Sequence, residues 1–425
     1  MFVLGLREKP LKVLVTLEDH LWHGTDGHLY VDGPTGYAAW SQLLDAFDEV
    51  ILLARAGQGS NHSVDGTLVD GPSVSVCELP DYVGPAQYLL NLPELRLRVE
   101  RAVMECDAFI LRVPGLIARL ACQETRRIKK DYAVEVLGDP WDAFSPGTMP
   151  GIFRPGYRWF ATRNMKKICR GAAAALYWNA SVLPRRYPPG NESYSGVSPS
   201  LVISDAYASG ELVAERSRRT DELRSSTGSA GAKTLHIGFV GSFAQLYKGP
   251  DTLLRAVSLC SRAGLDFKVF FVGEGRYRPT MELLANQLSV CDKVEFLGQL
   301  RFGKGIFDFL DSIDLFLMPS RAEGLPRALV EAMARGCPCI GSNIGGIPEL
   351  LVAEDLVPPN DPEVLARKIM EVTADPQRMK AMSARNLAKA KQFDPEALRD
   401  VRRAFYQYVR DHSVNNAKSE RQECL

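Results

Sequence analysis

The second half of the chain repeats one pattern, a short apolar run followed by residues with helical spacing of their apolar side chains. The runs fall at 235–243, 267–275, 294–300, 315–320 and 338–343. Short continuous apolar runs that alternate with helices are typical of parallel strands covered on both faces. Five such units within about 110 residues predict a doubly wound α/β domain.

The first half begins in the same way. Apolar runs at 11–19 and 48–56 enclose the segment 35–47, in which Trp40, Leu43, Leu44 and Phe47 follow helical spacing. Further strands are expected at 107–115, 131–139 and 200–207. The sequence therefore predicts the α/β class, with two facing Rossmann-like domains and a cleft between the carboxyl ends of their strands.

The predicted boundaries follow changes in composition. Residues 1–214 form the first domain, and 215–233, which are charged and then rich in Ser, Gly and Ala, have linker composition. Residues 234–392 form the second domain. Residues 393–425 are expected to be a helix returning toward the first domain and then a disordered tail, because 413–425 lack an apolar period.

Charge and cysteine content exclude several classes of protein. The 425 residues contain 51 Lys and Arg and 51 Asp and Glu, whereas a nucleic-acid-binding protein needs a basic surplus. No apolar stretch approaches the ~18 residues of a membrane span. The nine cysteines are scattered without a CxxC pair, which is typical of a reduced, cytoplasmic protein, and Cys337 and Cys339 are expected to be buried thiols.

The segment "SRAEGLPRALVE" at 320–331 carries the most chemistry. Glu323 is expected in the loop beyond a strand, Pro326 in the first turn of the next helix and Glu331 in its second turn. A helix N-terminus suits a diphosphate, and carboxylates accept hydrogen bonds from sugar hydroxyls. The pattern favours a nucleotide diphosphate sugar, and without a complete GxGxxG a nicotinamide enzyme is disfavoured.

A larger block resembles a known family. "PSRAEGLPRALVEAMARGCPCIGSNIGGIPEL" is similar to the signature of retaining glycosyltransferases of the GT-B fold, family 4 (glycosyl transferases group 1) in particular. The resemblance extends to 238–256 and 271–285 and is loose over the first 210 residues. It implies a nucleotide-sugar-binding second domain and an acceptor-side first domain.

The resemblance also implies roles for residues at matching positions. Glu323 would bind the donor sugar, and Lys248 would neutralise the diphosphate as its charge grows in the transition state. Glu331 would bind the ribose. Backbone approach to the donor would come from three residues, namely Gly241, Gly324 and Leu325.

One position departs from the family. Many members have an arginine after the glycine that corresponds to Gly241, where this chain has Ser242. Arg327, at the start of the helix, is a candidate for the missing cation. In the first domain, Gly36 of the loop 33–37 is expected to allow close backbone approach. Arg112 is either a substrate-binding cation or one half of an ion pair.

The segment 18–28 contains Glu18, Asp19, His20, His23 and His28. These are metal-ligand types, but their spacing places them on no regular face, so a polar loop is preferred to a metal site.

A basic helix is expected around 161–172. Ala161, Met165, Ile168 and Ala172 share one face and the opposite face carries Arg163, Lys166, Lys167 and Arg170. A packed helix with a solvated basic face is preferred. The alternative is attraction to anionic lipid or a pyrophosphate-linked acceptor, with Trp159 and Phe160 as shallow anchors.

The resemblance implies sugar transfer with retention from a UDP- or GDP-linked donor to a glycan or lipid-linked acceptor. No cofactor is expected, and the absence of a D-x-D predicts independence of metal. The expected location is cytoplasmic, with possible contact at the inner face of the membrane through the basic face at 163–170. Two alternatives are a sugar-nucleotide 2-epimerase of similar fold and a catalytically silent nucleotide-sugar-binding regulator.

Overall fold

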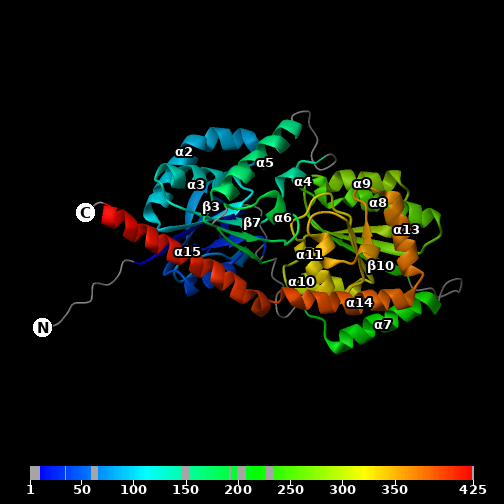
Figure 1. The fold of residues 1–425 in the computed structure, drawn as a ribbon. Coiled ribbons are helices and arrows are strands. Elements are labelled where there is room, and N and C mark those ends of the chain that lie inside the picture. Colours follow the sequence, from blue (N-terminus) through cyan, green and yellow to red (C-terminus); the bar gives the residue numbers. More distant parts are fainter. Residues whose placement is uncertain are drawn as a thin grey trace.

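The computed structural model describes residues 10–33, 35–58, 66–145, 154–190, 193–198, 207–225 and 234–423. Two sheets, each with helices on both faces, lie side by side, and a long C-terminal helix runs from the second domain back along the first (Figure 1). The predicted α/β class and the two Rossmann-like domains are confirmed.

The second sheet is fully parallel and has the order β12-β11-β10-β13-β14-β15. Its strands are β10 (Leu235–Val240), β11 (Phe267–Val272), β12 (Val294–Gly298), β13 (Leu315–Met318), β14 (Cys339–Ser342) and β15 (Leu356–Val357). The first five match the five predicted runs. The two-residue β15 is too short to leave an apolar run in the sequence.

Helices cover both faces of this sheet. They are α8 (Pro250–Arg262), α9 (Arg278–Gln287), α10 (Lys304–Ser312), α11 (Arg327–Ala334), α12 (Ile347–Leu350), α13 (Pro362–Thr373) and α14 (Pro376–Ala390). Asp361 and Asp375 accept hydrogen bonds from first-turn amides of α13 and α14, which fixes where these two helices begin. Cys337 and Cys339 are buried, as predicted.

The first sheet has a parallel part in the order β5-β3-β1-β6-β7-β8-β9. Its strands are β1 (Lys12–His23), β3 (Glu49–Gln58), β5 (Val74–Pro80), β6 (Ala108–Val113), β7 (Ala133–Val136), β8 (Ala174–Tyr177) and β9 (Tyr194–Val197). Two short strands, β2 (Leu29–Val31) and β4 (Thr67–Leu68), pair antiparallel at the end of β1. The sequence identified β1, β3, β6 and β7; residues 200–206 of the expected last strand lie outside the described residues.

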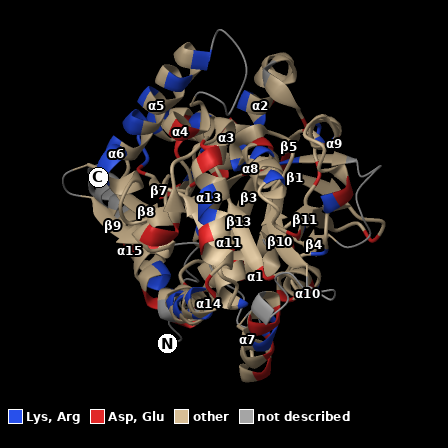
Figure 2. Cartoon of the chain, turned by 90° about the vertical axis from the view of Figure 1, so that its right-hand side faces the viewer, with Lys and Arg blue, Asp and Glu red and all other residues tan. Residues whose placement is uncertain are grey.

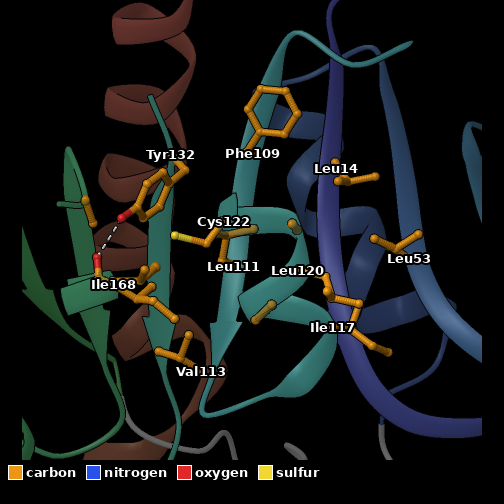
Figure 3. Close-up of a cluster of buried hydrophobic side chains, with 14 of the residues drawn as sticks. Leu14, Leu53, Phe109, Leu111, Val113, Ile117, Leu120, Cys122, Tyr132 and Ile168 are labelled. Atoms are coloured by element: carbon orange, nitrogen blue, oxygen red, sulfur yellow. Dashed lines mark hydrogen bonds between the residues drawn. The ribbon is translucent and has the colours of Figure 1, made fainter. Parts of the chain in front are cut away.

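Two groups of helices cover the two faces of this sheet. One face packs against α2 (Gly84–Glu105), α3 (Leu116–Arg127) and α5 (Arg154–Arg170), and Figure 3 shows part of that core. Within it, the Tyr132 hydroxyl donates to the Ile168 carbonyl of α5 at 2.9 Å. The other face packs against α1 (Tyr37–Trp40), the 3-10 turn Ser41–Asp45 and α15 (Pro395–Glu423).

The linker prediction is wrong for 215–225, because α7 occupies Gly210–Ser225. Arg216 is buried and donates to the carbonyls of Leu310, Ile313 and Arg335, so a charged side chain anchors this helix to the second domain. The polar sequence of α7 hides this, because its contact with the domain is made largely by hydrogen bonds. Residues 226–233 lie outside the described residues.

The predicted disordered tail is also wrong as far as residue 423, because α15 continues to Glu423. This helix contacts the first domain through polar side chains as well as apolar ones. Arg402 donates to Ser198 at 2.8 Å, Tyr406 donates to Glu135 at 3.3 Å, and His412 lies 2.9 Å from Asp131. Within the described ranges, every helix is too short or too polar to cross a bilayer.

Candidate functional site

Glu323 and Lys248 meet where two neighbouring parallel strands end. Lys248 lies in the 3-10 turn Leu246–Lys248 beyond β10, and Glu323 lies beyond β13. Lys248 Nζ and Ser320 Oγ each donate to Glu323 Oε1 at 2.7 Å. Burial opposes the charge of Lys248, but the Glu323 carboxylate outweighs it, so the pKa of Lys248 is raised.

Glycines let the surrounding loops approach closely. Gly345 has a φ of +55°, and a side chain there would meet the Glu323 carbonyl at 2.0 Å. Gly346 N–H donates to the Gly324 carbonyl at 2.7 Å. Gly249 has a φ of +73° and lies against the Pro319 carbonyl. The loop that carries Glu323 is therefore held by backbone contacts that only glycine permits.

The loop beyond β10 packs on the loop beyond β11. Side chains at Gly273 or Gly275 would lie 2.1 Å from backbone atoms of Gly241 and Ala244 respectively, so the incomplete "GEG" serves loop packing. Gly241 itself lies against the Lys248 stem. Ser242 Oγ accepts from Ala244 N–H at 3.1 Å and donates to the Glu274 carbonyl at 3.3 Å. Position 242 therefore stabilises the turn and supplies no cation.

Arg327 and Glu331 form an ion pair on α11. Arg327 Nε lies 2.8 Å from Glu331 Oε1, and the guanidinium lies over the Phe302 ring. Burial raises the pKa of Glu331 and lowers that of Arg327, and each charge partly offsets the effect on the other. Arg327 thus neutralises Glu331. The role of Arg327 as a cation for the phosphates therefore stays a prediction. Leu325, just before the helix, is buried.

The two domains touch at Gly324, which the sequence did not reveal. A side chain at Gly324 would meet the Leu137 carbonyl, beyond β7, at 2.3 Å. The buried Asn179, beyond β8, donates to the Gly324 carbonyl at 3.2 Å. The carboxyl ends of the two sheets therefore face each other, as predicted, but the predicted cleft is closed at this point.

Glu349 of α12 makes a second interdomain contact. Its carboxylate accepts from Ala180 N–H at 2.9 Å, from Ser181 N–H at 2.8 Å and from the Ser181 hydroxyl. Glu349 belongs to the "GGIPEL" end of the resemblance, which is a signal that could have drawn attention to it. Asn179 left no such signal, because the strand before it was not recognised.

The two predicted site residues of the first domain, Arg112 and Gly36, make contacts within that domain. Arg112 is buried and lies 3.2 Å from Glu135, over Trp40, so of the two alternatives the structure shows the ion pair. A side chain at Gly36 would collide with Thr67 at 2.3 Å, so this glycine permits packing of α1 on β4. Among the described contacts, neither residue touches Glu323 or Lys248.

The expected polar loop at 18–28 is mostly strand, because β1 runs to His23 with an irregularity between Thr16 and His20. His20, His23 and His28 pair separately with Asp81, Glu78 and Asp70. The described residues contain no cluster of three or more metal-ligating side chains.

Glu18 and Asp19 have structural partners. Glu18 accepts from Ile117 N–H at 2.7 Å at the start of α3, and burial raises the pKa of Glu18 against this bond. Asp19 accepts from the Thr35 hydroxyl at 3.3 Å. Both therefore support the end of the first sheet.

The basic helix is α5. Met165, Ile168 and the following Ala172 are buried, and Ala161 is half-buried. The four residues of the predicted basic face, Arg163, Lys166, Lys167 and Arg170, are exposed. Figure 2 shows the basic residues along α5 in blue. Packing of the small apolar face on the first domain is confirmed.

Comparison with known proteins agrees with this architecture. Residues 221–389 match the family model "Glycosyl transferases group 1". The chain is 25% identical to Protein CapJ of Staphylococcus aureus over 331 residues, 78% of each chain. It is 34% identical over 146 residues to the GDP-mannose-dependent monoacylated alpha-(1-6)-phosphatidylinositol monomannoside mannosyltransferase of Corynebacterium glutamicum, covering 32% of this chain and 38% of that enzyme.

A solved structure extends the similarity over nearly the whole fold. HepE of Anabaena, in complex with UDP and glucose, superposes with a TM-score of 0.63 at 18% identity, covering 92% of this chain and 97% of that one. The fold is that of GT-B glycosyltransferases. Together with the matched group 1 domain, it supports a glycosyltransferase.

Proposed function

We propose that this protein is a retaining family 4 hexosyltransferase that moves a sugar from a UDP- or GDP-linked donor to a hydroxyl of a glycan or lipid-linked acceptor. The observation that carries the proposal is the contact between Lys248 and Glu323, at the carboxyl ends of adjacent strands. In parallel α/β sheets this edge is where ligands bind.

The pair has the chemistry that the reaction requires. When the bond from the sugar to the diphosphate breaks, negative charge grows on the leaving phosphate, and a cation already in place stabilises it. Lys248 keeps its proton because its pKa is raised. Glu323, an acceptor only, is free to exchange its bond to Ser320 for one to a sugar hydroxyl.

The rest of the donor is assigned to α11 and the loops around it. No side chain among the described residues caps the start of α11, so its first amides are available to an anion. Glu331, one turn further along, is assigned to the ribose, and Gly241, Gly324 and Leu325 to backbone approach. No metal or cofactor is proposed, since Lys248, backbone amides and the helix dipole meet the phosphate charge.

The closed contact at Gly324 constrains the order of events. A side-chain carbon at Gly324 would lie 2.3 Å from the Leu137 carbonyl, so the domains touch beside Glu323, and we infer that they separate to admit a donor sugar. Closure around the bound donor would then exclude water, which favours transfer over hydrolysis.

The names of the relatives support a setting in cell-surface polysaccharide or glycolipid synthesis. HepE was solved with UDP, and the corynebacterial enzyme is GDP-mannose-dependent. UDP-sugars and GDP-sugars are therefore the donors to test. The buried, unpaired Cys337 and Cys339 suit the cytoplasm, where such donors are made.

A panel of UDP- and GDP-sugars tests the proposal. A true donor should raise the unfolding temperature, and an acceptor should then yield a product with the donor's anomeric configuration, read by NMR. Incubation with donor alone identifies an epimerase, which converts the donor without an acceptor. A silent regulator leaves the donor unchanged even when an acceptor is present. The matched group 1 domain does not favour the epimerase. Stabilisation without transfer to any acceptor would overturn the proposal.

A further inference from the structure

The outer surface of the α2, α3 and α5 layer exposes an unusual amount of apolar side chain. Ten of the thirteen large apolar residues exposed in the described chain lie between Val83 and Phe160. Leu90, at 80%, is the most exposed of those on α2, and Trp159, at 61%, is the most exposed of those on α5. Scattered exposed apolar residues need no explanation, but a group confined to one layer of one domain does.

These residues belong to one surface. Helix α3 packs against both α2 and α5, and all three cover the same face of the first sheet (Figure 1). Arg119 of α3 lies over the Phe160 ring of α5 at 5.0 Å, and its charge also acts on Tyr88 of α2. Leu89, Leu90, Tyr157, Trp159 and Phe160 define what is called here the apolar patch.

A basic stripe adjoins the apolar patch on the same helix. Helix α5 carries six Lys and Arg residues and no acidic residue. Arg163, Lys166, Lys167 and Arg170 are exposed in the C-terminal half of α5 and are called here the basic stripe. Figure 2 shows the Lys and Arg residues of α5 in blue, and the aromatic residues precede the basic stripe in the sequence. Aromatic side chains followed by cations match the two layers of a membrane surface, the headgroup–acyl boundary and the phosphates.

From this arrangement we infer that the face of α2 and α5 is a docking surface for an anionic lipid bilayer. The aromatic and leucine side chains enter the headgroup region, and the basic stripe lies on the lipid phosphates. Charge complementarity selects this partner, because no acidic residue of α5 offsets its cations. Docking goes beyond the proposed transfer reaction and does not depend on it.

The docking surface lies near the candidate site. Helices α2 and α3 begin just beyond the carboxyl ends of β5 and β6, so Leu89, Leu90 and Leu116 lie toward the edge of the sheet that faces Gly324. A bilayer held there would present its headgroups beside the entrance to the site.

Vesicle binding tests the inference without any substrate. The full chain is mixed with phosphatidylcholine vesicles with or without about one third phosphatidylglycerol, and bound protein is measured by flotation. Binding is expected only to the anionic vesicles, falling as salt rises, with a blue shift of tryptophan fluorescence. In the Trp159→Phe variant binding should persist, while most of the blue shift disappears.

Two double variants separate the charged and apolar contributions. Lys166→Glu with Lys167→Glu should weaken binding by at least about 25-fold, since each of the two lost cations contributes about fivefold and the new carboxylates repel the anionic surface. Leu89→Ser with Leu90→Ser should weaken binding on the order of tenfold and leave its salt dependence intact. The matched controls are Lys304→Glu with Lys391→Glu and Leu283→Ser, all at exposed positions of the second half of the chain.

Circular dichroism and thermal unfolding establish that each variant is folded. The inference is overturned if the wild type ignores anionic vesicles at low salt, or binds neutral vesicles equally well. It is also overturned if the control variants lose binding as strongly as the paired variants. Binding of the wild type to a protein partner but to no vesicle would likewise replace the bilayer as the occupant.

Discussion

Lys248 Nζ lies 2.7 Å from Glu323 Oε1, although 75 positions separate the two residues in the sequence. Their side chains are 15% and 6% exposed, so the pair is largely shielded from water. Because the Glu323 carboxylate already holds the Lys248 ammonium in place, this cation needs no reorganisation when negative charge develops on the leaving diphosphate.

The first prediction concerns this pair. Lys248→Met and Glu323→Gln should each lower kcat by roughly 10²–10³-fold, the cost of removing one preorganised electrostatic contact. Each single change also strands a partner in a shielded site and should lower stability. The double variant should recover part of the stability but none of the activity, as measured by denaturant unfolding and donor turnover.

The same changes at an exposed ion pair provide the control. Lys304→Met, Asp308→Asn and their combination alter a solvent-exposed pair on α10, where stability should move by less than about 1 kcal/mol. Recovery of activity in the Lys248→Met, Glu323→Gln double variant would contradict a direct role for the two charges.

The second prediction concerns Glu331, which is buried beside Arg327. Glu331→Ala should weaken binding of UDP or GDP by ~1–3 kcal/mol, because ribose hydroxyls lose their acceptor. It should also lower the unfolding free energy by about 3–5 kcal/mol, since Arg327 is left unpaired. Glu331→Ala with Arg327→Met should recover stability without recovering nucleotide affinity. Calorimetry with UDP or GDP measures the nucleotide affinity. An unchanged affinity in Glu331→Ala would contradict the assignment of Glu331 to the ribose.

The sequence predicts a strand well when that strand is a continuous apolar run. The strands β10, β11, β13 and β14 are largely buried and appear as continuous apolar runs, so the sequence identifies them. The half-buried edge strand β12 also has a recognisable apolar run. The strand Ala174–Tyr177 is equally buried but begins with two alanines, and Tyr194–Val197 contains a serine and a glycine. Neither leaves a strong apolar signal, so both were missed.

In the candidate site, too, some features can be predicted from the sequence and others cannot. The i,i+4 spacing of Arg327 and Glu331 is visible in the sequence, but its burial is not, and so the pairing was not foreseen. Asn179 and Gly324 are 145 positions apart and meet only because two sheets face each other. Contacts of this kind depend on the arrangement of domains, which local spacing does not encode.

The third prediction concerns metals. The described residues hold no cluster of metal-ligating side chains, and the sequence has no D-x-D. Transfer should therefore proceed at an unchanged rate in excess chelator, measured with purified donor and acceptor. Loss of activity that magnesium or manganese restores would contradict the assignment of phosphate charge to Lys248 and helix termini.

The fourth prediction is a pH dependence at His28, whose ring lies 2.9 Å from Asp70. The bond to Asp70 raises the pKa of His28 in the folded protein. The stabilisation is therefore fully present below the unfolded value of about 6.5 and is lost as pH rises through the folded value. His28→Gln should lower the unfolding temperature more at about pH 5.5 than at about pH 8.5. His236→Gln, at a ring beside the Ser312 carbonyl, is the control, and equal effects at both pH values would contradict the pairing.

The last prediction concerns domain closure. Glu349 accepts hydrogen bonds from the backbone of Ala180 and Ser181 across the interface, so Glu349→Ala should shift the chain toward an open arrangement. Small-angle scattering should show a larger radius of gyration, and kcat should fall about tenfold while nucleotide affinity changes little, because the donor site lies within one domain. Glu295→Ala, at an exposed ion pair on β12, should alter neither quantity. A compact Glu349→Ala protein with wild-type kcat would show that this contact does not set the distance between the domains.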